Sequence, residues 1–463
     1  MTLSQSKGHH AGKVLDVSEA SLLSRPIWNQ IGLTPWPVML FLLLLLLPIQ
    51  ISVTIGSIRL PPYRVMLLIF FVPGIVRLFS GGAGKVLLCD FFMLGFSLWM
   101  ALSLCYHYGL MTAIETGGAL VLDSFGAYLI ARLFLRNVKH FVGFCALLTV
   151  VVIGLALFTI PESILGKNFL RPSLVSDISP RMGFDRAFGP FDHPILFGAF
   201  CASAVGMSWY SLSPDTRFTP QRIARVSLIG LSAMTSLSAG AAATLMVQLT
   251  LIVWHRATTR LKRRWVTLFT IFATFWCLGY VVSNRGPMKV MLSYLTFSAG
   301  TAYQRLIIFE HASDDAMRHP IFGIGFERWD RPAWMFSASI DNFWLFVAVV
   351  YGSPALLLFA GAILYILIRI GRLPSFKTDQ SNIPLGYVVS MVGLIVAAVT
   401  VHFWSTIFVY MCFLVGAGVW LLNGTLQGSA VPLGVTKQAS PTSGRRVGAG
   451  KKIVAIHRRQ RRK

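Results

Sequence analysis

Charge is scarce in this 463-residue sequence, and acidic residues are scarcest. Only 13% of the residues are charged, with 17 Asp and Glu against 41 Lys and Arg, whereas soluble proteins carry about 25% charged residues. Hydrophobic residues make up 55% of the chain, and the mean hydropathy is +0.67. So little charge among long apolar runs excludes a large soluble domain and indicates an integral membrane protein.

Cysteine and nucleotide motifs are missing as well. The six cysteines lie within or at the edges of apolar runs, and no CxxC pair occurs. The sequence therefore predicts neither a disulfide framework nor a zinc site. HExxH, Walker A and GxSxG motifs are also absent from the sequence, so we expect no metal and no cofactor.

The net charge of +24 does not indicate nucleic-acid binding. Ten of the 41 basic residues lie in the tail 424–463, which contains no acid, and most others lie in short connectors between apolar runs. This distribution is typical of cytoplasmic loops of a membrane protein. We expect the tail to be a disordered cytoplasmic arm that contacts anionic membrane lipids.

The apolar runs predict an all-α, polytopic helical bundle, because about 20 apolar residues cross a membrane as a helix. Two long blocks, 223–254 and 385–423, are each interrupted by polar residues, at 236–240 and 400–405, and we split both. The sequence therefore predicts about 12 transmembrane helices. The eight other runs are 36–55, 64–80, 87–106, 116–135, 141–160, 192–211, 265–283 and 343–369.

Positive charge predicts the orientation of this bundle. With both termini cytoplasmic, the inner connectors carry Lys and Arg, and two long loops, about 161–191 and 284–341, lie on the outer face. In a bacterium this is the periplasmic face of the inner membrane. The chain is thereby divided into a cytoplasmic N-terminal segment, 1–34, a transmembrane domain, 35–423, and the basic tail.

The outer loops hold the residues that are candidates for chemistry. The first loop closes with RAFGPFDHPILFG at 186–198, which contains Arg186 and His193. The second contains AYQRLIIFEHASDDAMRHP at 302–320, which is typical of an amphipathic helix with Arg305 on it. In this helix we expect apolar contacts from Ile307, Ile308 and Met317.

Arginines on an outer face suit an anionic substrate such as a lipid diphosphate, because guanidinium presents a planar fork to phosphate oxygens. Each arginine has an alternative role, as an interfacial residue or as the partner of a loop carboxylate. His311 and His319 are candidates for a general base, since imidazole titrates near neutral pH. His193 stands at a helix start and is a candidate for either a cap or a substrate contact.

Five segments occur in an order and spacing that resembles the O-antigen ligase and polymerase superfamily of bacterial surface-polysaccharide assembly, which includes exopolysaccharide polymerases. The likeness spans about 180 to 420. The segments are RAFGPFDHPILFG (186–198), SLSAGAAATLMVQL (236–249), YQRLIIFEHA (303–312), HPIFGIGFERW (319–329) and SIDNFWL (339–345).

This resemblance implies a metal-independent, inverting glycosyltransferase on the periplasmic face. The implied donor is a glycan on undecaprenyl diphosphate, and the acceptor is a glycan or lipid A-core. Arg186 and Arg305 would hold diphosphate oxygens, and Gly323 and Gly325 match a PxFGxG turn where the backbone approaches closely. A chain-length regulator and other assembly proteins are the implied protein partners.

The sequence departs from the family pattern at two places. Asp341 and Asn342 stand where ligases present a His-Asn pair, so Asp341 either acts as the base or caps the following helix. Ala239 replaces an arginine of the SxSRG-like motif. Both departures leave polymerase and ligase open; Asn342 and Trp329 remain candidate glycan contacts.

A transporter or flippase of lipid-linked oligosaccharide is the main alternative function. Transport usually needs charge near the membrane midplane and paired repeats. Asp123 is the best such residue, but no repeat between the halves is evident, and charge concentrates in the outer loops. A non-catalytic assembly partner is a third possibility.

Overall fold

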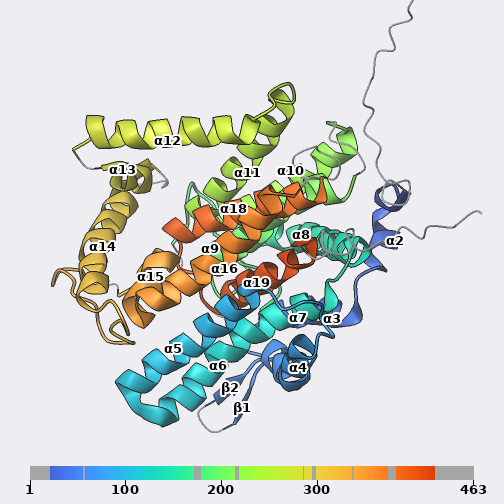
Figure 1. Cartoon of the computed structure of the whole chain (residues 1–463). Coiled ribbons are helices and arrows are strands. Elements are labelled where there is room, and N and C mark those ends of the chain that lie inside the picture. Colours follow the sequence, from blue (N-terminus) through green and yellow to red (C-terminus); the bar gives the residue numbers. More distant parts are fainter. Residues whose placement is uncertain are drawn as a thin grey trace, which may run out of the picture.

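The computed structural model describes most of the chain and is almost entirely helical in that part (Figure 1). The only strands among these residues are β1 (Val53–Ile55) and β2 (Ile58–Leu60), an antiparallel hairpin. The expected all-α class is therefore confirmed. The described residues are 21–55, 58–171, 179–213, 218–284, 286–294, 299–335, 338–373 and 382–422.

The helices follow one another with short connections. In the first half they are α2 (Ile27–Ile31), α3 (Trp36–Leu45), α4 (Pro62–Phe79), α5 (Leu88–Thr112), the π-helical η1 (Ala113–Gly117), α6 (Gly118–Val121), the π-helical η2 (Leu122–Gly126), α7 (Ala127–Phe134), α8 (Val138–Leu165) and α9 (Pro194–Ser211). In the second half they are α10 (Pro220–Met234), α11 (Ala239–Ala257), α12 (Arg264–Val282), α13 (Gly286–Tyr294), α14 (Ala299–Arg318), α15 (Phe343–Tyr351), α16 (Ser353–Gly371), α18 (Ile383–Thr400) and α19 (Ser405–Gly418).

Local sequence explains where these helices begin. Proline occupies the first turn of α3, α4, α9, α10, α16 and α18, where its missing N–H costs no helical hydrogen bond. The side chains of Asn137, His193, Thr219 and Asn342 cap α8, α9, α10 and α15 by accepting backbone N–H bonds.

Helix α9 forms the centre of the bundle, since every residue in it except Ile195 is buried. It packs closely against α18 through Gly206 and Gly386. A Cβ atom on Gly206 would lie 2.9 Å from the Gly386 carbonyl oxygen, and one on Gly386 would lie 3.0 Å from that of Gly206. Glycine at both positions therefore lets the two backbones touch, as in other membrane bundles.

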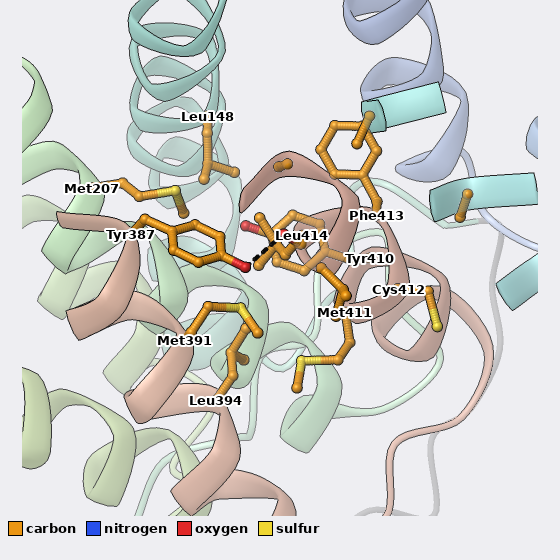
Figure 2. Close-up of a cluster of buried hydrophobic side chains, with 14 of the residues drawn as sticks. Leu148, Met207, Tyr387, Met391, Leu394, Tyr410, Met411, Cys412, Phe413 and Leu414 are labelled. Carbon is orange, nitrogen blue, oxygen red and sulfur yellow. Dashed lines mark hydrogen bonds between the residues drawn. The ribbon is translucent and has the colours of Figure 1, made fainter. Parts of the chain in front are cut away.

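The apolar core continues from α18 to α19 (Figure 2). The Tyr387 and Tyr410 rings lie there among methionine and leucine side chains, and both are fully buried. The Tyr387 hydroxyl donates to the Leu414 carbonyl oxygen at 3.1 Å, so its polar tip is satisfied inside the core.

Seven helices of the described residues are long and apolar enough to cross a membrane. They support a membrane protein, whereas the expected number of about 12 spans is not confirmed. The seven are Pro62–Phe79, Leu88–Phe134, Val138–Leu165, Arg264–Val282, Ser353–Gly371, Ile383–Thr400 and Ser405–Leu422.

Some predicted runs have a different shape in the structure. The run 36–55 holds only the ten-residue α3, about 15 Å long, and then enters the hairpin. The run 343–369 breaks into α15 and α16 at Gly352, where φ is 86°. Gly109, with φ 81° and ψ 176°, kinks the end of α5. The splits of both long blocks are confirmed, since α10 and α11 are separate helices, as are α18 and α19.

Helices α12, α13 and α14 leave the bundle and return to it (Figure 1). No residue of α12 except Arg264 is buried. The expected helix at 302–320 is confirmed as α14, which packs against α15. Ile307 and Ile308 are buried in it as predicted, but Met317 is 70% exposed, so the apolar contact predicted for Met317 is wrong.

The two ends of the chain extend past the described part. In the segment 1–34, Leu22 and Leu23 are buried and α2 packs on α8, while 1–20 lies outside the described residues. The predicted tail 424–463 also lies outside them.

Candidate functional site

Four chain connections meet near the starts of α9 and α15, and Ser405 Oγ at the start of α19 donates to Asp192 Oδ2 before α9 at 3.4 Å. The loop before α9 joins the α10–α11 connection, because Ala187 N donates to the Thr235 carbonyl oxygen at 3.0 Å. The start of α15 joins the α18–α19 connection, because Phe343 N donates to the Val401 carbonyl oxygen at 3.1 Å. Backbone hydrogen bonds thus hold the loops that carry the candidate residues at one end of the bundle.

Arg186 is a buried cation at this end. Its Nε donates to the Ser236 carbonyl oxygen at 3.2 Å, and its Nη2 finds no hydrogen-bond partner within the described part of the chain. Burial lowers the pKa of Arg186 to about 10, and the positive charge of Arg181 adds to this effect. A guanidinium that is held but not neutralised is suited to receive an anion.

Arg305 on α14 belongs to the same electrostatic group. It is 7% exposed, and burial lowers the pKa of its guanidinium. The Asp341 carboxylate opposes that shift, while Arg181 adds to it. The charge of Arg181 therefore acts on both Arg186 and Arg305, and that of Asp341 acts on Arg305.

His193 caps α9 and stays neutral. Its Nδ1 accepts from Ile195 N at 3.2 Å, which leaves Nε2 as the protonated nitrogen. Burial lowers the pKa of His193 to about 4, with further contributions from Arg186 and Arg181. Its ring lies 5.6 Å from the Trp404 ring. His193 therefore caps α9, and its Nε2–H is a neutral hydrogen-bond donor within the electrostatic reach of Arg186 and Arg181.

The sequence left two roles open for Asp341, a base or a cap of α15, and the structure excludes the second. The cap of α15 is Asn342, whose Oδ1 accepts from Leu345 N at 3.1 Å, so the cap role considered for Asp341 is wrong. Asp341 is half-buried and accepts from Ser339 Oγ at 2.8 Å. Its carboxylate thus remains a candidate proton acceptor.

His311 and His319 lie elsewhere on the α14 segment. His311 is half-buried, and His319 is exposed after the last turn of α14. The His319 backbone accepts from Gly323 N and donates to the Asp315 carbonyl oxygen. Among the described contacts, no hydrogen bond or ion pair joins either imidazole to the arginines, so their base role stays a prediction.

Gly323 and Gly325 dock the turn after α14 onto the end of α15. Both have positive φ, 65° and 64°. Ile324 N donates to the Val349 carbonyl oxygen at 2.8 Å, and Gly325 N donates to that of Val350 at 3.0 Å. A Cβ atom on Gly323 would lie 2.4 Å from the Val349 carbonyl oxygen. The close approach in this turn is therefore to the protein's own backbone, and it anchors the helix that carries Arg305.

Trp329 is 4% exposed and packs with Ile307, Ile308 and Ala312 of α14. Its Nε1 donates to the Ala338 carbonyl oxygen at 2.9 Å. These contacts fix the second loop against α14, and a glycan contact from Trp329 stays a prediction.

Glu162 was missed by sequence reasoning, and it positions the loop that carries Arg186. This carboxylate at the end of α8 is 3% exposed. It accepts from Phe188 N at 3.0 Å and from Gly189 N at 3.1 Å. Asn168 Nδ2 donates to it as well, at 2.9 Å. A single acid closing a long apolar run was the available signal, since such a group needs buried partners.

We expect Glu162→Ala to destabilise the protein, because it leaves the Phe188 and Gly189 amides buried without an acceptor. Each lost acceptor costs about 1–3 kcal/mol, so the thermal unfolding midpoint in detergent should fall clearly. The control is Glu310→Gln, which removes a 3.5 Å ion pair from a 59% exposed carboxylate and should change stability by less than about 0.5 kcal/mol. Equal midpoints for the two variants would contradict this role.

His402 lies in the α18–α19 connection and extends the aromatic surroundings of His193. Its ring stacks with Trp404 at 5.4 Å and lies 4.0 Å from that of Phe346. Burial lowers the pKa of His402 to about 4. The imidazoles of His193 and His402 are therefore both neutral at pH 7.

Stability should fall as the pH decreases from about 6.5 towards 4. An unfolded histidine protonates near pH 6.5, whereas folded His193 and His402 resist protonation down to about pH 4. The unfolded chain therefore binds more protons in this window, which favours unfolding. His193→Asn keeps a capping side chain and should reduce the pH slope of the unfolding midpoint. A variant with the full wild-type slope would contradict this prediction.

In this arrangement the guanidinium groups of Arg186 and Arg305 can bind an anion, and the Asp341 carboxylate can accept a proton. In the described ranges, no three His, Cys, Asp or Glu side chains gather as metal ligands. No family model matches this chain, and no curated protein matches it either.

Proposed function

We propose that the chain is a membrane glycosyltransferase that polymerises or ligates glycans carried on undecaprenyl diphosphate, on the periplasmic face of the bacterial inner membrane. The observation that carries the proposal is the group of Arg186, Arg305 and Arg181 at one end of an apolar helical bundle. Arg186 in particular has a guanidinium nitrogen without a partner in the described structure. A lipid diphosphate offers phosphate oxygens at the level of the membrane surface while its tail stays in the bilayer.

The proposed reaction is a displacement at the anomeric carbon of the donor sugar. An acceptor hydroxyl of a glycan or lipid A-core forms the new bond to this carbon. The bond from the carbon to the diphosphate oxygen breaks, and its electron pair leaves with undecaprenyl diphosphate. Attack from the face opposite the leaving group inverts the configuration. Arg186 and Arg305 stabilise the charge that develops on the diphosphate.

Asp341 is the proposed base that takes the hydroxyl proton. We favour it over His311 and His319 because its charge acts on Arg305, which would place the base beside a phosphate-binding residue. His193 would add a neutral hydrogen-bond donor, and Asn342 would support the base by fixing the start of α15. This proposed mechanism needs no metal or cofactor.

Asp123 gives little support to the transport alternative. This residue in η2 forms a two-point ion pair with Arg64, at 2.6 and 3.0 Å. An acid neutralised in this way does not provide the free charge that a coupling ion or an anionic cargo requires.

Deleting the gene and separating the cell-surface polysaccharide on a gel tests the proposed function. Loss of the polymer ladder with single units remaining would indicate a polymerase, and lipid-linked polymer not attached to lipid A-core would indicate a ligase. Complementation with Arg305→Ala should fail to restore polysaccharide. Accumulation of lipid-linked units on the cytoplasmic face would indicate a flippase instead and would overturn the proposal.

A further inference from the structure

A groove lies between the segment that contains α2, the start of α10 and one face of α8. Its volume is about 730 Å³, within the range of about 300–1,000 Å³ that small-molecule sites occupy. Segments 23–28 and 212–213 line it, together with Thr219, Gln221, Arg225 and one face of α8. Figure 1 shows α2 and α10 near α8, and both pack against it.

The floor of the groove is apolar and belongs to a candidate membrane span. Val150, Ile153, Gly154 and Leu157 line it, and their spacing puts them on one face of α8. This face extends about 10 Å along the helix axis. Leu157 is 74% exposed, and a Cβ atom on Gly154 would meet no atom within 4 Å. The surface is therefore open to the hydrocarbon of a bilayer.

The rim of the groove is cationic. Arg25 is exposed, and the Arg225 guanidinium is held by the Leu212 carbonyl oxygen at 3.3 Å and by Ser213 Oγ at 2.7 Å. None of the described lining residues is acidic. The 15-residue α10 begins at the same rim, with Thr219 and Gln221 lining the groove and no acid in its first turn. Its positive dipole end adds to the two arginines.

We propose that this groove binds one membrane phospholipid with an anionic headgroup. An acyl chain would lie along Val150 to Leu157, and the headgroup phosphate would meet Arg25, Arg225 and the start of α10. Trp28, which is 70% exposed and lines the groove, is the type of residue found at the membrane–water interface. The inference is independent of the proposed glycosyl transfer, because the groove shares no residue with that site.

Native mass spectrometry of the full chain tests the proposal, with phosphatidylglycerol and phosphatidylcholine as probes. Wild-type protein should retain one phosphatidylglycerol and much less phosphatidylcholine. Gly154→Leu should abolish this retention, because the new side chain extends into the groove. Gly230→Leu is the matched control, since a Cβ atom there also meets no atom within 4 Å and Gly230 lies outside the groove; it should bind like wild type.

Substitutions of the rim arginines test the headgroup contact separately. Removing one rim arginine should weaken phosphatidylglycerol binding about fivefold, so Arg25→Gln with Arg225→Gln should weaken it about 25-fold. The exposed pair Arg256→Gln and Arg260→Gln lowers the net charge equally and should leave binding unchanged. Equal retention of both lipids, or equal binding by the Gly154→Leu and Gly230→Leu variants, would overturn the proposal. Unfolding midpoints without added lipid show that each variant is folded.

Discussion

Arg186→Met should lower the rate of glycan transfer by about 100-fold or more without lowering stability. Loss of one preorganised donor for a developing negative charge typically costs about 2.7–4 kcal/mol of transition-state stabilisation. The same residue contributes little to the fold, because its charge is buried without an acidic partner in the described ion pairs and burial lowers its pKa to about 10. An apolar side chain of similar length removes that desolvation penalty. Transfer rates and unfolding midpoints measured on the same preparation check both parts.

Arg132→Met is the matched control, since Arg132 is also a buried arginine but is fully paired. Its Nε donates to Asp90 Oδ1 at 3.0 Å, and its Nη atoms donate to the Ala83 and Lys85 carbonyl oxygens. Removing it leaves a buried carboxylate without its cation, which costs about 3–5 kcal/mol. We therefore expect opposite results: Arg186→Met loses activity and Arg132→Met loses stability. An Arg186→Met protein that unfolds as readily as Arg132→Met would show that Arg186 is structural.

Gly352→Ala should be among the most destabilising single substitutions in the chain. Gly352 has φ 86° and ψ 167° at the break between α15 and α16, a conformation that is essentially restricted to glycine and costs other residues about 1–3 kcal/mol. In addition, a Cβ atom there would lie 1.9 Å from the Ile321 carbonyl oxygen. This backbone atom belongs to the turn that follows α14, so the strain would reach the helix that carries Arg305. Thermal unfolding and the yield of folded protein measure the effect.

Gly109→Ala separates the two contributions to this effect. Gly109 has nearly the same backbone conformation, with φ 81° and ψ 176°, but a Cβ atom there would meet no atom within 4 Å. It should therefore cost only the conformational part, about 1–3 kcal/mol, while Gly352→Ala costs more by the steric part. Equal losses at the two positions would contradict the close contact between Gly352 and the Ile321 carbonyl.

Hydropathy predicted the membrane bundle and its longest helices, because a lipid-exposed helix must be apolar over its whole length. It was least informative where a long apolar run breaks or ends early, as in 343–369 and 36–55. The break at Gly352 depends on contacts with the 320–325 turn. Those contacts join residues that are distant in sequence, so no local pattern reports them.

The sequence pointed to some residues of the candidate site and not to others. Arg186, His193, Arg305 and Asp341 were all proposed from loop composition and a family resemblance. In the structure the charge of Arg181 acts on Arg186, His193 and Arg305, and the charge of Asp341 acts on Arg305. Glu162 was not identified, because its partners are backbone amides. The sequence shows a single acid at the end of a long apolar run, but not which backbone amides it binds.

The central claim is that the arginine group holds the diphosphate of a lipid-linked glycan while the sugar is transferred. The most direct measurement is transfer by the purified protein in proteoliposomes that contain a labelled glycan on undecaprenyl diphosphate and an acceptor glycan. We predict one new glycosidic bond for each undecaprenyl diphosphate released, in the presence of a metal chelator, and loss of both products with Arg186→Met. Movement of intact donor across the bilayer without release of undecaprenyl diphosphate would contradict the account.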